Sequence, residues 1–355
     1  MELEQAQQAE LAPLPFRFTG NGSEYFRIWI VNLLLTVLTL GIYGAWAKVR
    51  RLKYFYGSTE LAGARFDYHG DPLVILKGRL FAIGLFLVYS AATNIISIWS
   101  LVALVFLAVV LPWLLRNSFR FRMRNSSYRG LRFGFDGSVG AAYETFLLHP
   151  FIMFFTLYLA GPLFHARLKQ YQHGNSRYGT ARFAFSANAG DFYGAYGLIM
   201  VLFFGAMMLS IFAMIGVIAA AAVTGGEDGP NPEMIAAATG IVFLGIFGSM
   251  ILLTPLWVAR IQNLVWNHTT LGEHRFSSAV KVGPLLGIML GNFILIMLTL
   301  GLYAPWAAVR VARYRVESLA MLPAGDIDAF VASEAEAVSA MGEETAEVFD
   351  FDIGL

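Results

Sequence analysis

The sequence contains no cysteine and few charged residues, and both shortages limit what the protein can be. Without cysteine the chain can form neither a disulfide nor a thiolate metal site. Only 14% of its 355 residues are charged and 57% are hydrophobic, whereas a soluble domain averages roughly 25% charged residues. Zinc-protease, phosphate-loop and nucleophile-elbow motifs are also missing from the sequence. We therefore expect a membrane protein that is not an enzyme and has no metal or cofactor.

Charge is missing altogether from six long runs. No Asp, Glu, Lys or Arg occurs in residues 28–47, 80–115, 145–166, 194–226, 234–259 and 282–309. A membrane-spanning helix needs about 20 mostly apolar residues, so five runs suit one span each and the 36-residue run suits two. We predict an all-α polytopic membrane protein with about seven transmembrane helices. The expected spans are about 25–46, 74–93, 97–115, 145–164, 194–223, 234–258 and 283–305.

An Arg-Phe pair recurs five times along the chain. The pairs are Arg17–Phe18, Arg65–Phe66, Arg132–Phe133, Arg182–Phe183 and Arg275–Phe276. In four of them the Phe follows 21 residues after a helix-end residue, namely Ala45, Pro112, Pro162 or Pro255. Equal offsets indicate internal repeats. Each module is predicted to be an interfacial helix extension, which Asn, Ser or Thr side chains end, followed by a short strand.

The apolar runs between these modules predict inverted repeats. One span alternates with two, so the repeating unit holds three spans, and an odd number of crossings inverts each copy relative to the last. We expect a disordered leader at 1–15, repeat 1 at 16–131, an inverted repeat 2 at 132–274, a partial repeat 3 at 275–320 and an acidic cytoplasmic tail at 321–355.

The distribution of Lys and Arg predicts the orientation. Under this scheme one membrane face carries 16 of these residues and the other carries 9, so the positive-inside rule places the amino terminus outside and the carboxyl terminus in the cytoplasm. The leader lacks the features of a cleavable signal peptide. An alternative stays open, because the three single spans could be re-entrant hairpins broken at Gly41 and Gly301. Every basic module would then lie in the cytoplasm.

The chain after Met321 changes character. It has nine acidic residues and no basic one. Residues 327–348 are predicted to form a polar helix, and "VFDFDI" alternates apolar and acidic residues as a strand does. The tail is either solvated or docked on the basic modules, where it would add a strand.

Three lone polar residues form the candidate intramembrane site. Asn32, His149 and Asn292 each lie 18 residues before an Arg, early in an otherwise apolar span. Polar groups inside membranes often mark pathways, and equivalent positions could converge near a repeat axis, as in inverted-repeat transporters. The simpler alternative is that each side chain hydrogen-bonds a neighbouring helix.

The recurring Arg and the tryptophans are expected at the membrane surface. The Arg side chains either satisfy carbonyl groups at helix ends or bind lipid phosphates. Trp46, Trp113 and Trp306 stand where apolar helices meet basic stretches, as interfacial anchors do. The Arg-rich run at 116–129 is explained by the positive-inside rule, so we expect membrane lipids rather than nucleic acid as partners.

Several stretches together resemble a known family. "NLLLTVLTLGIYGAWAKVR" (32–50), "NSSYRGLRF" (125–133) and the terminal "FDFDIGL" are similar to the YjgN family of bacterial inner-membrane proteins, a domain of unknown function. The resemblance covers about residues 16–355 and implies a bacterial cytoplasmic membrane. It implies no activity and no site residues.

Two functional hypotheses follow. The first is a transporter-like or channel-like protein for a small solute, based on the inverted repeats and the set Asn32, His149 and Asn292. The second is a non-transporting interaction or envelope-maintenance protein that binds lipids or partners through its basic modules and acidic tail.

Overall fold

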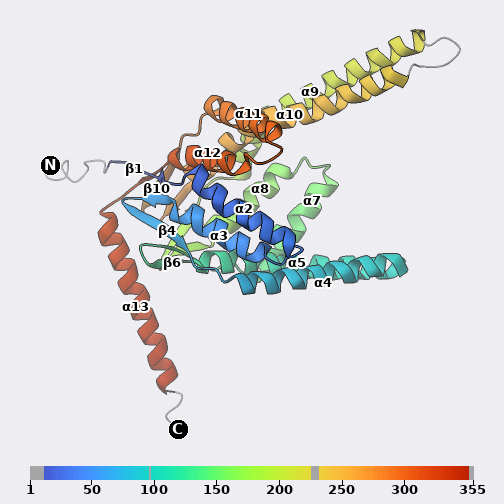
Figure 1. Cartoon of the computed structure of the whole chain (residues 1–355). Coiled ribbons are helices and arrows are strands. Elements are labelled where there is room, and N and C mark those ends of the chain that lie inside the picture. Colours follow the sequence, from blue (N-terminus) through green and yellow to red (C-terminus); the bar gives the residue numbers. More distant parts are fainter. Residues whose placement is uncertain (1–11, 96, 225–231, 352–355) are drawn as a thin grey trace.

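The computed structural model describes residues 12–95, 97–224 and 232–351. An 11-stranded sheet forms one end of the molecule, and helical hairpins extend from it in Figure 1. Residues 1–11 of the predicted disordered leader lie outside the described residues. The last two residues of that leader, Leu14–Pro15, form a strand. The prediction of an all-α protein is therefore wrong.

The helices form five hairpins, and short strands connect each hairpin to the next. The helices are α2 (Gly22–Leu38), α3 (Gly44–Gly57), α4 (Pro72–Ile95), α5 (Ser97–Arg124), α6 (Val139–Tyr143), η1 (Glu144–Leu148), α7 (His149–Phe155), α8 (Gly161–Gly174), α9 (Ala189–Thr224), α10 (Pro232–Asn267), α11 (Val282–Leu298), α12 (Ala304–Glu317) and α13 (Ile327–Phe351). The strands are β1 (Leu14–Pro15), β2 (Arg17–Phe18), β3 (Thr59–Leu61), β4 (Ala64–Tyr68), β5 (Ser126–Tyr128), β6 (Leu131–Phe135), β7 (Ser176–Tyr178), β8 (Ala181–Phe185), β9 (Thr269–Leu271), β10 (His274–Ser278) and β11 (Leu319–Leu322).

Hydroxyl and amide side chains end the second helix of a hairpin, as the sequence predicts. The Ser126 hydroxyl donates to the Arg122 carbonyl at 2.9 Å, and the Ser176 hydroxyl donates to the Gln172 carbonyl at 2.7 Å. These bonds satisfy carbonyl groups that a helix end leaves without partners. A glycine with positive φ then turns the chain between the two strands, at Gly63, Gly130, Gly179 and Gly272.

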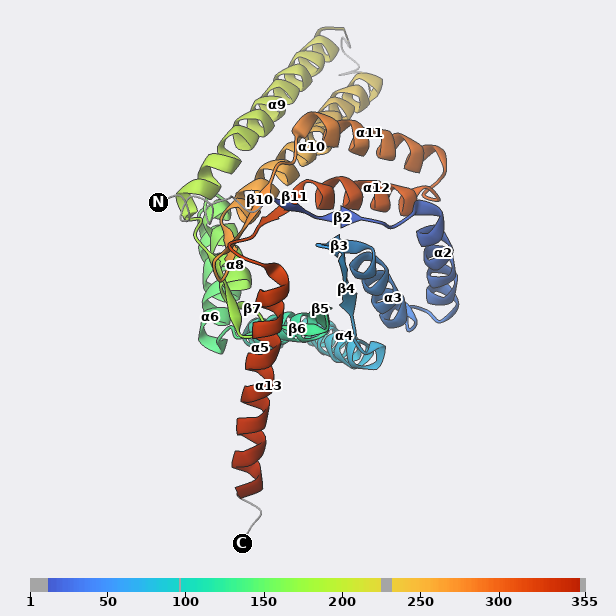
Figure 2. The ribbon, with the colours of Figure 1, turned by 90° about the vertical axis from the view of Figure 1, so that its left-hand side faces the viewer.

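The amino-terminal segment closes the sheet into a barrel. The strands follow the order β1-β11-β10-β9-β8-β7-β6-β5-β4-β3-β2, and neighbouring strands in this order are antiparallel. Only Phe16 separates β1 from β2, so one extended segment pairs with β11 on one side and with β3 on the other. The Phe16 amide donates to the Leu319 carbonyl at 3.0 Å, and the Thr19 amide donates to the Ser58 carbonyl at 2.8 Å. Figure 2 shows the resulting ring of strands with the hairpins around it.

Two of the five hairpins are long enough to cross a membrane. They contain the four described helices that qualify by length and apolar composition, within α4, α5, α9 and α10. The other three hairpins turn back halfway, α2 into α3 at Gly41, with φ of +93°, and α11 into α12 at Gly301, with φ of +92°. The seven-span prediction is therefore wrong, because the predicted spans at about 25–46, 145–164 and 283–305 are helical hairpins. Breaks at Gly41 and Gly301 are the alternative that the sequence left open.

The closed barrel also overturns the inverted repeats. Strands from all five modules pair with one another, so residues 16–131 and 132–274 contribute to one ring on one side of any membrane. Leu14 pairs with Met321, which places these two points of the chain side by side. A seven-span arrangement with its ends on opposite faces does not fit this pairing.

Five phenylalanine rings fill the barrel in a closed circle. Neighbouring ring centroids are 6.2 to 6.5 Å apart around the circle of Phe16, Phe66, Phe133, Phe183 and Phe276. We call this circle the Phe ring. Because side chains alternate along a strand, the neighbouring Arg residues point outward and are exposed.

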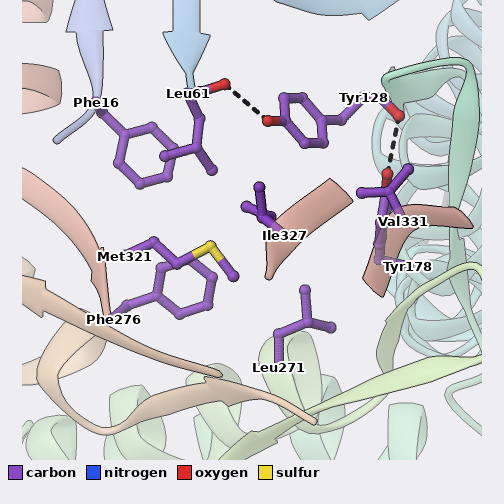
Figure 3. Close-up of a cluster of buried hydrophobic side chains, with 9 residues drawn as sticks. All are labelled: Phe16, Leu61, Tyr128, Tyr178, Leu271, Phe276, Met321, Ile327 and Val331. Atoms are coloured by element: carbon purple, nitrogen blue, oxygen red, sulfur yellow. Dashed lines mark hydrogen bonds between the residues drawn. The ribbon is translucent and has the colours of Figure 1, made fainter. Parts of the chain in front are cut away.

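A second layer of inward side chains lies beside the Phe ring. It consists of Leu61, Tyr128, Tyr178, Leu271 and Met321 (Figure 3). The Tyr128 hydroxyl donates to the Leu61 carbonyl at 2.7 Å, and the Tyr178 hydroxyl donates to the Tyr128 carbonyl at 3.0 Å. These bonds join neighbouring modules and satisfy two buried hydroxyl groups.

Helix α13 docks on the barrel at this layer. Ile327 and Val331 belong to the same buried cluster. The Glu334 carboxylate accepts from the Thr180 amide and hydroxyl, both at 2.6 Å, and from the Ala181 amide at 2.8 Å. The predicted polar helix at 327–348 is thus present. The predicted strand is wrong up to Phe351, which still lies in α13, and its last residues lie outside the described part.

We expect Phe276→Ala to destabilise the protein by about 3–5 kcal/mol, because truncation of a buried Phe leaves a cavity. Phe276 is 8% exposed, whereas Phe247 on α10 is 57% exposed. Thermal unfolding in detergent should show a clear loss for Phe276→Ala and little change for Phe247→Ala. Equal losses in the two variants would contradict the role of the Phe ring as the core.

Candidate functional site

A cavity of about 650 Å³ lies directly beside the Phe ring, on the side of the helical hairpins. We call it the vestibule. Phe66, Phe133 and Phe183 line it from the barrel, and the helices α3, α5, α8, α10 and α12 all contribute side chains to its walls. A hollow bounded by all five hairpins is the natural place for a ligand in this fold.

The vestibule is basic. Arg122, Lys169 and Arg315 line it, one from each of α5, α8 and α12, and no described Asp or Glu lines it. Arg122 and Arg315 keep much of their surface accessible because they project into the cavity rather than into packed protein. Three cations without a carboxylate partner create a positive field in a partly enclosed space.

Amides rather than acids hold two of these cations. The Arg315 Nε donates to the Gln262 side-chain oxygen at 2.6 Å, and the Gln262 amide donates back to the Arg315 carbonyl at 2.9 Å. The Lys169 ammonium donates to the Gln172 oxygen at 3.2 Å. The Arg122 guanidinium has neither a hydrogen-bond nor an ion-pair partner among the described residues. The positive charge is therefore oriented but not neutralised.

The surroundings disfavour protonation of the groups on α8. Burial lowers the pKa of Lys169 below its usual range, and the charges of Arg122 and Arg315 lower it further. Burial, with the charge of Lys169, lowers the pKa of His173 to about 4, so this imidazole is neutral at pH 7. A bound anion would stabilise the cationic form of Lys169. The arrangement therefore suits binding of an anion.

A second, larger cavity of about 1020 Å³ continues the vestibule. The two cavities share the lining residues Arg122, Gln262, Trp266 and Arg315. Elsewhere the larger cavity is lined mostly by apolar side chains of α10, α11 and α12. We call it the apolar chamber.

The structure places the three predicted polar residues in three different hairpins. Asn292 contacts its own return helix, since its amide donates to the Ala307 carbonyl at 3.3 Å and its oxygen accepts from Arg310 at 3.1 Å. His149 lies 2.7 Å from the Glu144 carbonyl through Nδ1, and the buried oxygen of Asn32 has no hydrogen-bond partner. Asn292 lines the apolar chamber, but among the described residues no hydrogen bond joins any two of the three.

The Arg-Phe pairs separate into two sets of side chains. Four of the five Phe residues enter the Phe ring, while Arg17, Arg65, Arg132, Arg182 and Arg275 are exposed on the outside of the barrel. In the first pair the ring position is held by Phe16 rather than Phe18, because Phe18 pairs with Thr59 and packs with Tyr25 and Val309. None of the five guanidinium groups caps a described helix.

Two of the predicted interfacial tryptophans, Trp46 and Trp306, lie in the first turn of α3 and α12, and Trp113 lies inside α5. Trp46 stacks on Tyr43 at 6.0 Å and Trp306 stacks on Tyr303 at 5.8 Å, each on the N-cap residue of its own helix. Trp113 is 47% exposed on α5, next to Pro112. Their place at a membrane surface stays a prediction.

Sequence reasoning missed the vestibule residues. Arg122 and Arg315 each lie four residues before the first residue of the following strand, Ser126 and Leu319. This common spacing indicates that the side chains of Arg122 and Arg315 take equivalent positions relative to the barrel. The Arg-rich run around Arg122 instead suggested only a membrane-surface role.

Known proteins resemble most of this chain. The family model described as "Bacterial protein of unknown function (DUF898)" matches residues 13–348. The "Inner membrane protein YjgN" of Escherichia coli strain K12 is 26% identical over 74% of this chain, and the protein of that name from Salmonella typhimurium is 26% identical over 88% of it. The alignments cover 51% of the Escherichia coli relative and 88% of the Salmonella relative, so the chain spans about half the length of the former.

No solved structure matches the chain significantly. The family match, by contrast, extends over nearly all of the barrel and its hairpins, from before β1 into α13. The protein belongs to the DUF898 family of bacterial proteins of unknown function, whose curated relatives are the inner membrane proteins named YjgN.

Proposed function

We propose that this protein is an inner-membrane anion-binding protein whose barrel faces the cytoplasm and whose vestibule holds the anion. The relatives are named inner membrane proteins, and four described helices are long and apolar enough to span a membrane. The observation that carries the proposal is the cluster of Arg122, Lys169 and Arg315 in a cavity that no described Asp or Glu lines.

The orientation is supported by where the basic residues lie in the folded chain. The sequence has 25 Lys and Arg residues, and most of them lie in the barrel or in the helix portions toward it. None occurs in residues 28–47, 80–115, 133–166, 183–259 and 282–309, which contain the far ends of the five hairpins. The positive-inside rule then favours a cytoplasmic barrel, with both Leu14 and Met321 on that side.

The direction of the cations supports binding rather than a purely structural role for them. Lipid-facing Arg and Lys near a membrane surface extend toward the headgroups, but these three project inward from different hairpins into one cavity. Partial burial and the charges of Arg122 and Arg315 disfavour the charged form of Lys169. A bound anion would offset this repulsion.

Transport of a small solute is the second candidate, and the position of the vestibule favours it. The vestibule lies beside the barrel interior, which the Phe ring, the second layer and α13 fill. Passage along this route requires the Phe ring and α13 to move apart. Binding without transport requires no such movement, and for this reason we place binding first.

Single cysteines should locate the barrel in the cytoplasm. Asp67 and Gln170 are exposed beside the barrel, and Thr224 is exposed at the far end of α9. In a chain without native cysteine, Asp67→Cys and Gln170→Cys should react with a membrane-impermeant maleimide only after the inner membrane is opened. Thr224→Cys should react in spheroplasts. Labelling of Asp67→Cys in intact spheroplasts would contradict the orientation.

Sulfate should stabilise the protein against thermal unfolding in detergent, and Arg122→Gln should weaken that effect about tenfold. A hydrogen bond to a charged group contributes about 1.5–3 kcal/mol, and 1.4 kcal/mol corresponds to a factor of about ten. Arg182→Gln is the matched control, because Arg182 is an exposed residue outside the barrel. If the two variants respond to sulfate alike, the vestibule is not the binding site.

Sulfate affinity should fall as pH rises through the lowered pKa of Lys169, because the neutral amine no longer attracts the anion. Sulfate keeps its charge over this range, so the change reports the protein. Without ligand the sign is opposite: the folded state binds this proton more weakly than the unfolded state, so stability rises with pH. Lys169→Met should therefore raise the melting temperature of the sulfate-free protein by a few degrees and flatten the pH dependence of sulfate binding. A variant that loses both stability and pH dependence would indicate a structural role.

A further inference from the structure

The apolar chamber gives the anion site a second, chemically different half. Its cationic end holds Arg122 and Arg315, which it shares with the vestibule, together with Arg51 of α3. The remaining lining comes mainly from apolar side chains on three helices: Ile251 on α10, Met289, Phe293 and Ile296 on α11, and Ala304, Ala308 and Val311 on α12.

The chamber extends away from the barrel along these helices. On α10, Ile251 precedes Gln262 by 11 residues, which is about 16 Å at the rise of a helix. On α12, Ala304 precedes Arg315 by the same number of residues, so both walls extend equally far from the cations. Since α12 starts at the turn of its hairpin, the apolar end of the chamber lies at the depth of that turn.

Small side chains on α12 make this space. Ala304, Ala308 and Ala312 follow at intervals of four residues, so they lie on one face of the helix, and all three line the chamber. Larger residues at these positions would fill the space between α12 and the helices opposite. A chamber of about 1020 Å³ is far larger than a free inorganic anion needs.

We propose that the ligand is an anionic phospholipid, with its phosphate at Arg122, Lys169 and Arg315 and an acyl chain in the apolar chamber. This inference rests on the proposed anion site and adds the class of ligand. The cation count favours a phosphate over a single carboxylate, because guanidinium groups bind phosphate oxygens in pairs. The cytoplasmic leaflet beside the barrel contains anionic phospholipids, so the ligand is available on the side where the cations lie.

The test distinguishes binding of the acyl chain in the apolar chamber from binding of the phosphate at the cations. Ala308 lines the apolar chamber but not the vestibule, so Ala308→Trp fills the chamber without removing a cation. Ala237, exposed on α10, provides the matched control Ala237→Trp. Binding of phosphatidylglycerol and of sulfate is measured on the purified full chain in detergent, by native mass spectrometry and by thermal stabilisation respectively.

We expect Ala308→Trp to weaken phosphatidylglycerol binding about tenfold, while sulfate stabilisation stays at the level of the unmodified chain and of Ala237→Trp. Retained sulfate stabilisation also shows that the variant is folded. If Ala308→Trp does not fold, the smaller substitution Ala308→Leu is used with the same readouts. Arg122→Gln should weaken both ligands.

Three results would overturn the inference and leave the anion site intact. They are sulfate stabilisation without phosphatidylglycerol binding, equal binding of phosphatidylglycerol and zwitterionic phosphatidylethanolamine, and tighter binding of a fatty acid such as laurate than of phosphatidylglycerol. Failure of both sulfate and phosphatidylglycerol to bind would overturn the proposed function as well.

Discussion

The whole arrangement depends on one set of backbone hydrogen bonds, those of the segment from Leu14 to Thr19. This segment pairs with β11 on one side and with β3 on the other, and so it removes both free edges of the sheet. A closed ring of strands fixes the order of the five hairpins around an axis. It also directs every second strand residue inward, which places the Phe ring at the centre and the vestibule next to it. The proposed anion site is therefore a consequence of closure rather than of any one hairpin.

The sequence predicted the local structure well because local structure depends on neighbouring residues. The Asn, Ser and Thr residues that end the helices, the positive-φ glycines and the common offsets are all visible in the chain. The number of spans was not, because α11, the turn and the first residues of α12 form one uncharged run, 282–309, in which only Gly301 marks the turn. A continuous span and a re-entrant hairpin have the same composition. Counting a hairpin as a single span reverses the predicted membrane side of every later loop. Three such errors produced a false inverted repeat. The predicted topology left 9 Lys and Arg on the outer face, against 16 on the inner one, and this weak asymmetry argued against it. In the folded chain the far ends of the five hairpins contain no Lys or Arg.

The candidate site was missed for a related reason. Asn32 and Asn292 stand out as lone polar residues in apolar helices, but Asn292 is explained by its own hairpin, where it contacts Ala307 and Arg310. Arg122 and Arg315 do not stand out, because they belong to basic stretches that any membrane protein carries beside its spans. They differ from other basic residues only because their side chains point into the vestibule. This direction follows from their position four residues before the next strand, which is informative only when the strands are known to form a ring.

Closure also sets an order on the biogenesis of the protein. The two strands that complete the ring, β1 and β11, are separated by nearly the whole chain, and Met321 is made long after Leu14. All five hairpins are therefore synthesised while β2 and β3 can pair but β1 still lacks its partner. A ribosome that stops before β11 releases a chain with two open strand edges, which are prone to pair with other chains. Closure of the barrel thus requires synthesis at least through β11.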